Sequence, residues 1–367
     1  MRNEAMYRSM VFSRLSRVAK STSQFRGVAR CPLREFEKDR CSPAAFPDYV
    51  KVMRLLLIDG HYYCYRSFYA IRDLKNSRGE NTNAIFGFIK TMRKMLKDLR
   101  PDLAAVLWDQ GLPLRRTTLQ PDYKATRTET PCDLRPQIDA LIKMVPAFGL
   151  KSIGVPDTEA DDLMATYATV ARARGDEVIL ATNDKDLFQL VDEKCFVYST
   201  NKTDLADPKD PHALLDAAKV QEKWGVPPSQ IGEVLALIGD TVDNIPGVPG
   251  IGPKTAVSLL AQFGSLDALL SNLASVKANR ARESLTASVE HIAKNREMVR
   301  LDLDLPLPVP LDDLRIEPRW DEMVAAMESC EFRSLTAEVR AEASAAGVVP
   351  PSPQPKSSEG LSQGELF

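Results

Sequence analysis

Short apolar runs alternate along the chain with longer segments in which apolar residues recur at helical spacing. The runs are rich in branched residues and span 52–59, 103–109, 150–155 and 177–182. The helical segments between them span 83–98, 135–148 and 160–174. Strands that alternate with helices in this way predict an α/β fold with a mostly parallel, helix-covered sheet.

The pattern changes at about residue 212, where strand-like runs give way to helical spacing. The later helical segments span 214–224, 229–239, 253–263 and 265–273. We therefore expect an α/β core over 51–211 and a helical region over 212–335. Residues 336–367 are rich in Ala, Ser, Pro and Gly and lack aromatic residues until the last position, which predicts a disordered tail.

Residues 1–50 differ from the rest of the chain. Between Met1 and Arg34 there are eight basic residues and one acid, interleaved with serines. This composition suits an organellar transit peptide. We favour the alternatives, which are a disordered extension or a start codon upstream of the true one at Met53.

Charge and composition narrow the classes of function. Lys plus Arg number 48 against 50 for Asp plus Glu, so the net charge of −2 attracts no polyanion and any nucleic-acid contact must be a local patch. No apolar run approaches the roughly 20 residues that span a bilayer, so we expect no membrane contact. The six cysteines and three histidines show no zinc-ligand spacing, so a bound metal would need oxygen ligands.

Carboxylates gather in five clusters, three of which follow a predicted strand. The clusters contain Asp59; Asp109; Glu159, Asp161 and Asp162; Asp184 and Asp186; and Asp240 and Asp243. In an open α/β sheet the carboxyl ends of the strands border the ligand crevice, so these acids should converge there. Carboxylates about 4 Å apart repel by several kcal/mol, and Mg²⁺ or Mn²⁺ is the counterion that oxygen ligands favour.

The spacing within one cluster separates its members. At a predicted helix start, Glu159 and Asp162 share a face while Asp161 points elsewhere, so one of them is expected to be a cap or a supporting residue. A single acid at such a place is more often a cap or a solvated turn. Five clusters in this order favour a metal site.

The ordered motifs resemble the structure-specific 5′ nucleases, which include flap endonucleases and the 5′-nuclease domain of bacterial DNA polymerase I. The resemblance runs from about Arg54 to about residue 335 and is closest to the polymerase-linked form, here without the polymerase. It rests on the segments LLIDGHYYCYRSF, GFIKTMRKML, DYKATR, TEADDLMATYA, LATNDKDLFQLV and GDTVDNIPGVPGIGPKTA.

The resemblance implies a PIN-like α/β nuclease core, a helical arch and two catalytic divalent ions. The implied ligands are Asp59, Asp109, Glu159, Asp161, Asp184, Asp186 and Asp240, supported by Asp162 and Asp243. Two such ions clamp the attacking water and the leaving oxygen of a phosphodiester, so no protein nucleophile is needed. We expect His61 to support the turn after the first strand rather than to bind metal.

Residues 110–135 form a long basic insertion at the position of the family's arch. The resemblance implies that Lys124 and Arg127 contact phosphates and stabilise developing charge. It also implies that Tyr123 stacks on a base, and we count Arg116 and Arg66 as further DNA contacts. Arg115 stands where an aromatic residue is usual and Thr118 where an acid is usual.

A glycine-rich segment follows the last acidic cluster. Its glycines, Gly247, Gly250 and Gly252, are spaced for a tight turn, and the helix predicted to follow carries Lys254 and Thr255 in its first turn. Residues 240–263 resemble the family's helix–hairpin–helix, which grips the duplex backbone without reading sequence and often carries K⁺.

The chain ends in two apolar residues. Gln363, Leu366 and Phe367 resemble the short peptide by which bacterial replication proteins bind the sliding clamp. We therefore expect a monomeric, Mg²⁺-dependent 5′→3′ exonuclease and flap endonuclease in a bacterial cytosol, acting on DNA with 5′ ends or flaps. An organelle, an RNA-directed nuclease of related fold, and a non-catalytic clamp-tethered scaffold are the alternatives.

Overall fold

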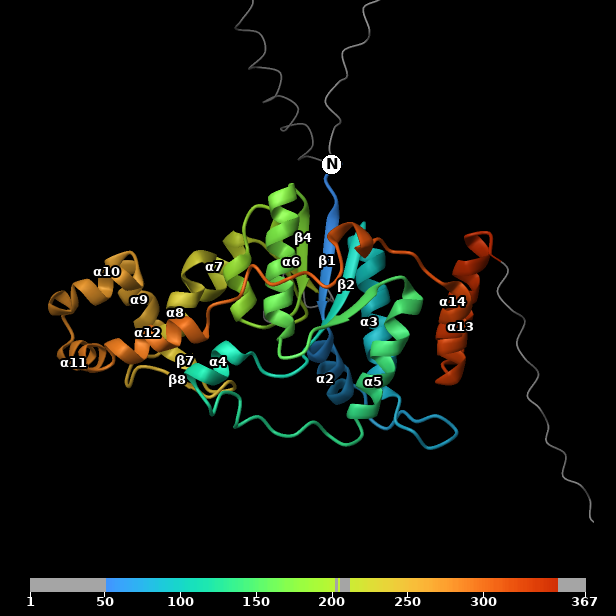
Figure 1. Ribbon diagram of the computed structural model, residues 1–367, viewed down its shortest axis with the longest axis horizontal. Coiled ribbons are helices and arrows are strands. Elements are labelled where there is room, and N and C mark those ends of the chain that lie inside the picture. Colours follow the sequence, from blue (N-terminus) through green and yellow to red (C-terminus); the bar gives the residue numbers. More distant parts are fainter. Residues whose placement is uncertain (1–50, 202–203, 205–211, 349–367) are drawn as a thin grey trace, which may run out of the picture. The chain divides into compact units, whose positions relative to one another are not determined.

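The computed structural model describes residues 51–201, 204 and 212–348, and its six-stranded sheet confirms the predicted fold class. The strands lie in the order β3-β2-β1-β4-β5-β6. Figure 1 labels the three central strands β2, β1 and β4. The strand bounds are β1 (Arg54–Asp59), β2 (Leu103–Trp108), β3 (Lys151–Gly154), β4 (Glu177–Ala181), β5 (Cys195–Ser199) and β6 (Ala213–Leu215). All neighbours pair in parallel except β6, which is antiparallel to β5.

Each predicted helical segment contains a helix, and further helices lie outside those segments. The helices of the first half are α2 (Gly60–Ala70), α3 (Asn83–Leu99), α4 (Leu114–Leu119), α5 (Arg135–Met144) and α6 (Ala160–Arg174). Those of the second half are α7 (Ala217–Trp224), α8 (Ile231–Ile238), α9 (Pro253–Phe263), α10 (Leu266–Ser271), α11 (Asn279–Ala287), α12 (Val289–Met298), α13 (Trp320–Ser329) and α14 (Arg333–Ala345). A two-stranded hairpin, β7 (Gly239–Asp240) and β8 (Ile245–Pro246), links α8 to α9.

Alternate residues of each strand feed two hydrophobic cores, one on each face of the sheet. Leu55 and Leu57 of β1 pack with α6 on one face. Leu56 and Ile58 pack on the other face with α2, α3, α5 and α13. Because both faces are covered, the strands read as continuous apolar runs rather than as alternating ones.

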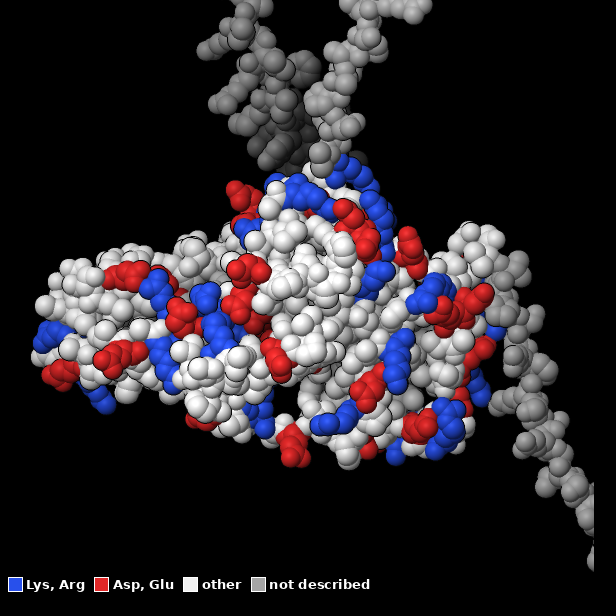
Figure 2. Space-filling model, in the orientation of Figure 1, with Lys and Arg blue, Asp and Glu red and all other residues white. Residues whose placement is uncertain are grey.

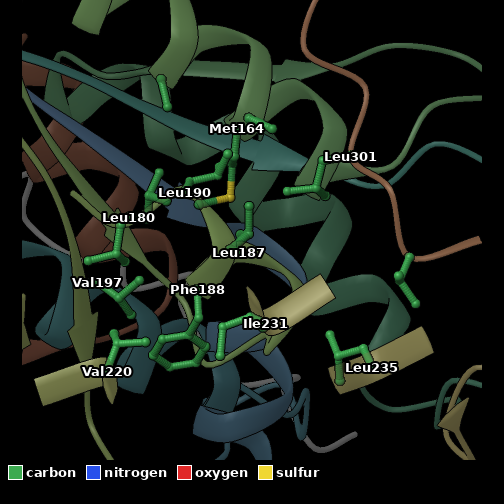
Figure 3. Close-up of a cluster of buried hydrophobic side chains, with 14 of the residues drawn as sticks. Met164, Leu180, Leu187, Phe188, Leu190, Val197, Val220, Ile231, Leu235 and Leu301 are labelled. Atoms are coloured by element: carbon green, nitrogen blue, oxygen red, sulfur yellow. The ribbon is translucent and has the colours of Figure 1, made fainter. Parts of the chain in front are cut away.

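The core beside α6 continues without interruption into the C-terminal helices. Figure 3 shows Met164 of α6 and Leu180 of β4 in one cluster with Phe188, Ile231 and Leu235. Phe188 lies in the 3₁₀ helix η2 (Asp186–Leu190), and the last two residues lie in α8. The sheet and the helical region therefore share one core, and β6 extends the sheet past the predicted boundary at 211.

Helix α14 covers part of the range expected to be a disordered tail. Leu335, Val339 and Ala343 recur every four residues and are buried. Arg93 of α3 pairs with Glu338 at 3.0 Å and with Glu342 at 2.7 Å. A narrow apolar stripe and two ion pairs thus hold a helix that composition alone obscured. The predictions for 1–50 and for Gln363, Leu366 and Phe367 lie outside the described residues.

Within the described residues no helix is both long and apolar enough to span a membrane.

Candidate active site

The carboxyl ends of β1, β2 and β4 meet where the strand order reverses, which is the usual place for a ligand crevice. Asp59 ends β1 and caps α2, accepting a hydrogen bond from the Tyr62 N–H at 2.9 Å. Asp109 follows β2 and accepts one from the Ala160 N–H at 2.7 Å. Asp184 follows β4, and its own N–H bonds to Thr182 at 3.0 Å. Backbone contacts thus fix all three acids at one edge.

A cavity of about 690 Å³ opens at this edge. Of the residues predicted from sequence, those that line it are Asp59, Asp109, Asp161, Asp184, Lys124 and Arg127. Sequence reasoning missed other lining residues, namely Tyr62, Tyr65, Thr126, Thr128, Asn183, Thr241 and Val242. Tyr62 and Tyr65 follow Asp59 on α2, and this proximity was the available signal.

Several of these acids lack a cationic partner, and their pKa values are raised. Burial and repulsion from Asp109 raise the pKa of Asp59 to about 7. Burial, then repulsion from Asp184, raises the pKa values of Asp161 and Asp186 well above the usual range. The buried Asp186 Oδ1 has no hydrogen-bond partner. This edge of the site therefore carries more negative charge than its surroundings neutralise.

A second group of acids is neutralised by cations of the protein itself. Glu159 pairs with both Arg116 and Lys124. Asp240 pairs with Lys185 at 2.7 Å, and Asp243 with Arg127 at 2.6 Å. As the side chains stand, no three His, Cys, Asp or Glu residues in the described part of the chain are grouped closely enough to hold a metal ion.

The structure corrects the prediction for Arg116. Arg116 is 2% exposed and donates from two nitrogens to Asp162, at 2.6 and 2.9 Å, so it does not face phosphate. Both oxygens of Asp162 accept hydrogen bonds from this guanidinium. The prediction that Glu159 and Asp162 share a face is confirmed, because both contact Arg116.

Tyr123 is also buried rather than open to a base. It is 5% exposed, and its hydroxyl donates to Glu159 at 3.2 Å. Burial, then repulsion from Glu159, raises its pKa. Lys124 has a left-handed φ of 58°. Burial alone would lower the pKa of Lys124, but attraction to Glu159 and Asp243 outweighs it, and the ammonium stays charged.

His61 contacts the residue that follows β2. Its Nδ1 accepts a hydrogen bond from the Asp109 N–H at 3.2 Å, and its ring packs edge-on against Trp108. Burial lowers its pKa. The neutral ring therefore carries its proton on Nε2.

The glycine-rich turn of residues 247–252 lies apart from the cavity, between β8 and α9. A Cβ at Gly247 would meet the Ile238 carbonyl oxygen at 2.1 Å, so this glycine is required by close packing. Gly250 has a φ of 79° and Gly252 precedes α9, and a Cβ at either would meet nothing within 4 Å. Lys254 is exposed and Thr255 half-buried. The backbone here is accessible to a phosphate chain.

Other surface charges are mixed. Arg66 is exposed on α2 and donates to the Thr200 carbonyl at 3.4 Å. On the face in Figure 2, basic and acidic side chains are interspersed without a broad region of one sign. This agrees with a net charge near zero.

Two family models match the chain in succession. Residues 54–225 match the 5′-3′ exonuclease N-terminal resolvase-like domain, and residues 226–322 match the 5′-3′ exonuclease C-terminal SAM fold.

Curated relatives include two bacterial DNA polymerases. The chain is 37% identical over 294 residues to DNA polymerase I of Rhizobium leguminosarum, covering 78% of this chain and 28% of the relative. It is 40% identical over 286 residues to the thermostable DNA polymerase I of Thermus filiformis, covering 78% and 33%. The chain thus spans about a third of the length of the relatives it matches.

Solved structures share the fold. The T5 D15 protein, co-crystallised with metal ions, has a TM-score of 0.57 at 20% identity, covering 78% of this chain and 98% of that one. The catalytic core of Rad2 in complex with DNA substrate has a TM-score of 0.53 at 17% identity, covering 78% and 91%.

Proposed function

The chain belongs to the 5′-3′ exonuclease family and is a nuclease, and we propose that it hydrolyses DNA phosphodiesters at 5′ ends and flaps with the help of two divalent ions. The observation that carries this proposal is the cavity that Asp59, Asp109, Asp161 and Asp184 line together with Lys124. A non-catalytic binder gains nothing from buried carboxylates that repel phosphate.

The residues present fit divalent cations. Their donors are carboxylate oxygens, which Mg²⁺ and Mn²⁺ prefer. The raised pKa values of Asp59, Asp161 and Asp186 and the unpartnered Asp186 Oδ1 mark a deficit of positive charge. We assign Mg²⁺ to Asp59, Asp109, Asp161, Asp184 and Asp186, with Glu159 and Asp240 completing the set.

The protein's own side chains would bind and orient the DNA strand that is cleaved. When bound, the two ions supply Lewis-acid stabilisation of the attacking water and the leaving oxygen. Lys124 and Arg127 line the same cavity and would exchange Glu159 and Asp243 for phosphate oxygens, stabilising charge as it develops. The neutral His61, with its proton on Nε2, would donate to an oxygen in the cavity.

Duplex DNA would lie on the turn of residues 247–252. Its open glycines let a phosphate backbone approach the N–H groups at the start of α9, and the exposed Lys254 adds charge. On the resemblance alone, we also propose a K⁺ ion at this turn.

A tether to the bacterial sliding clamp through Gln363, Leu366 and Phe367 extends the proposal to primer removal and repair. So short an anchor would bind in the micromolar range. A peptide of the last ten residues should bind a bacterial clamp, and the doubly substituted Leu366→Ala, Phe367→Ala peptide should not.

Cleavage of a labelled 5′-flap duplex tests the central proposal. The full chain should cut the flap with Mg²⁺ and leave it intact with EDTA. The same flap made of RNA separates a DNA nuclease from an RNA-directed one. Binding of the flap without cleavage at any Mg²⁺ concentration would favour the scaffold instead.

A further inference from the structure

Arg115 lies in α4, near the start of the segment of residues 110–135, and contacts the C-terminal end of helix α12. Its side chain is 22% exposed. It donates to the carbonyl oxygens of Glu297 and of Arg300, the latter at 2.7 Å, and its Nε lies 3.2 Å from Asp302 Oδ1. Glu297 lies in the last turn of α12, and Arg300 and Asp302 follow the helix. Helix carbonyls lack partners at this end and a cation is favoured there. The residue that departs from the family pattern therefore caps this helix.

Helix α12 also contacts Pro246, the residue before the turn of residues 247–252. Asn295 donates to the carbonyl oxygens of Ala236, at 3.0 Å, and Pro246, at 2.8 Å. His291 Nε2 lies 2.7 Å from the same Pro246 oxygen. Pro246 directly precedes Gly247, so a shift of the turn must move α12 or break these bonds.

Helix α4 also reaches the acidic site. The Arg116 guanidinium donates to the carbonyl oxygens of Met298 and Arg300, both at 3.0 Å. The same group pairs with Glu159 and Asp162. The Asp302 N–H donates to Asp162 at 3.0 Å. Contacts thus run without a break from the turn, through α12 and the two arginines, to the N-terminal end of α6.

We propose that Arg115 is a positioning residue that couples duplex binding at residues 247–252 to the placement of Glu159, an inference that rests on the proposed function. Arg116 is buried among core acids, so its loss disturbs folding directly. The hydrogen bonds and the ion pair of Arg115 go to residues 297–302, so its loss weakens the attachment of α12 to α4. Arg116 keeps its own bonds to both Met298 and the acids. Where the related nucleases have an aromatic residue, Arg115 of α4 therefore makes hydrogen bonds and an ion pair to residues 297–302.

The test compares two substrates in Arg115→Met, which keeps the aliphatic stem and removes the donors. The substrates are a 5′-flap duplex and a single-stranded tetranucleotide, which offers no duplex to the turn. Coupling of this kind changes rates by roughly three- to thirtyfold. We expect kcat on the flap duplex to fall by that factor with KM nearly unchanged, and cleavage of the tetranucleotide to stay at the wild-type rate.

Two further variants serve as controls for Arg115→Met. Arg300→Met removes a neighbouring exposed charge but leaves the Arg300 carbonyl in place, and it should behave like wild type. Arg115→Lys keeps a charge that reaches fewer acceptors, and it should lie between wild type and Arg115→Met. Equal losses on both substrates, or no loss on either, would overturn the proposal.

Hydrogen exchange gives a readout that does not need cleavage. Duplex DNA should protect the backbone amides of residues 160–164 in the wild type and protect them less in Arg115→Met. Equal protection of these amides by duplex DNA in the wild type and in Arg115→Met would refute the coupling, even if both proteins cleave DNA. A wild type that binds duplex and shows the difference, but cuts nothing, would refute the proposed function alone.

Discussion

Replacing Arg116 with methionine separates a buried structural cation from a surface DNA contact. The Arg116, Glu159 and Asp162 side chains are 3%, 2% and 1% exposed, so the variant leaves two acids buried with one fewer counterion. Breaking one partner out of a buried ion pair costs about 3–5 kcal/mol. We take about 2.1 cal/mol/K of unfolding entropy for each residue that the structure describes. The loss of unfolding free energy then lowers Tm by roughly 5–8 °C.

The assay pairs thermal unfolding with DNA affinity measured against salt. Arg116→Met should lower Tm and leave the salt slope of duplex binding unchanged. The matched variant Lys254→Met removes an exposed cation, so it should leave Tm unchanged and reduce the slope by about 0.9 for one lost phosphate contact.

A further substitution sharpens the reasoning. Asp162→Asn should cost less stability in the Arg116→Met background than in the wild type, because it removes a charge already left unpaired. If Arg116→Met instead reduced the salt slope by about one and left Tm unchanged, the guanidinium would be a phosphate contact and our interpretation would be wrong.

Three other predictions concern the acids and the arch. Asp184→Ala should abolish flap cleavage while gel-shift affinity stays within a fewfold of wild type, and near-normal turnover at saturating Mg²⁺ would reject the ligand assignment. Lys124→Ala should slow single-turnover cleavage by about a hundredfold or more while affinity changes little, and equal losses would make Lys124 an ordinary phosphate contact. In EDTA, Tm should fall as pH rises from 5.5 to 8. The folded state holds the Asp59 proton to a pKa of about 7, against 3.8 for the free side chain, so this stability is lost as pH passes 7. Asp59→Asn should flatten the profile, and an unchanged slope would contradict the burial of that charge.

The sequence predicted the parallel sheet and most helices, because buried strands and amphipathic helices leave strong local patterns. It missed β5, although the strand is as long as β4, and it assigned most of β6, a strand of three residues, to the predicted helical segment 214–224. It also missed α14, whose stripe of Leu335, Val339 and Ala343 is narrow and set in tail-like composition.

The acids of the site were located from sequence because strand ends and helix starts fix them. Which cations neutralise them could not be located in this way. Arg115 and Arg116 are adjacent in a short basic segment, yet one caps α12 and the other is buried against Asp162. Only the tertiary arrangement separates them, since periodicity over the six residues of α4 says nothing about partners more than forty residues away.

The shared hydrophobic core sets a limit on how the chain can be divided. The two family models meet between residues 225 and 226, but Phe188 shares one hydrophobic cluster with Ile231 and Leu235, which lie beyond that junction. A fragment ending at 225 would expose this apolar surface to water, and it would lose the packing that holds η2, directly after Asp184, in place. The helical region from residue 226 onward therefore cannot be removed or exchanged without disturbing η2 and the acids beside it.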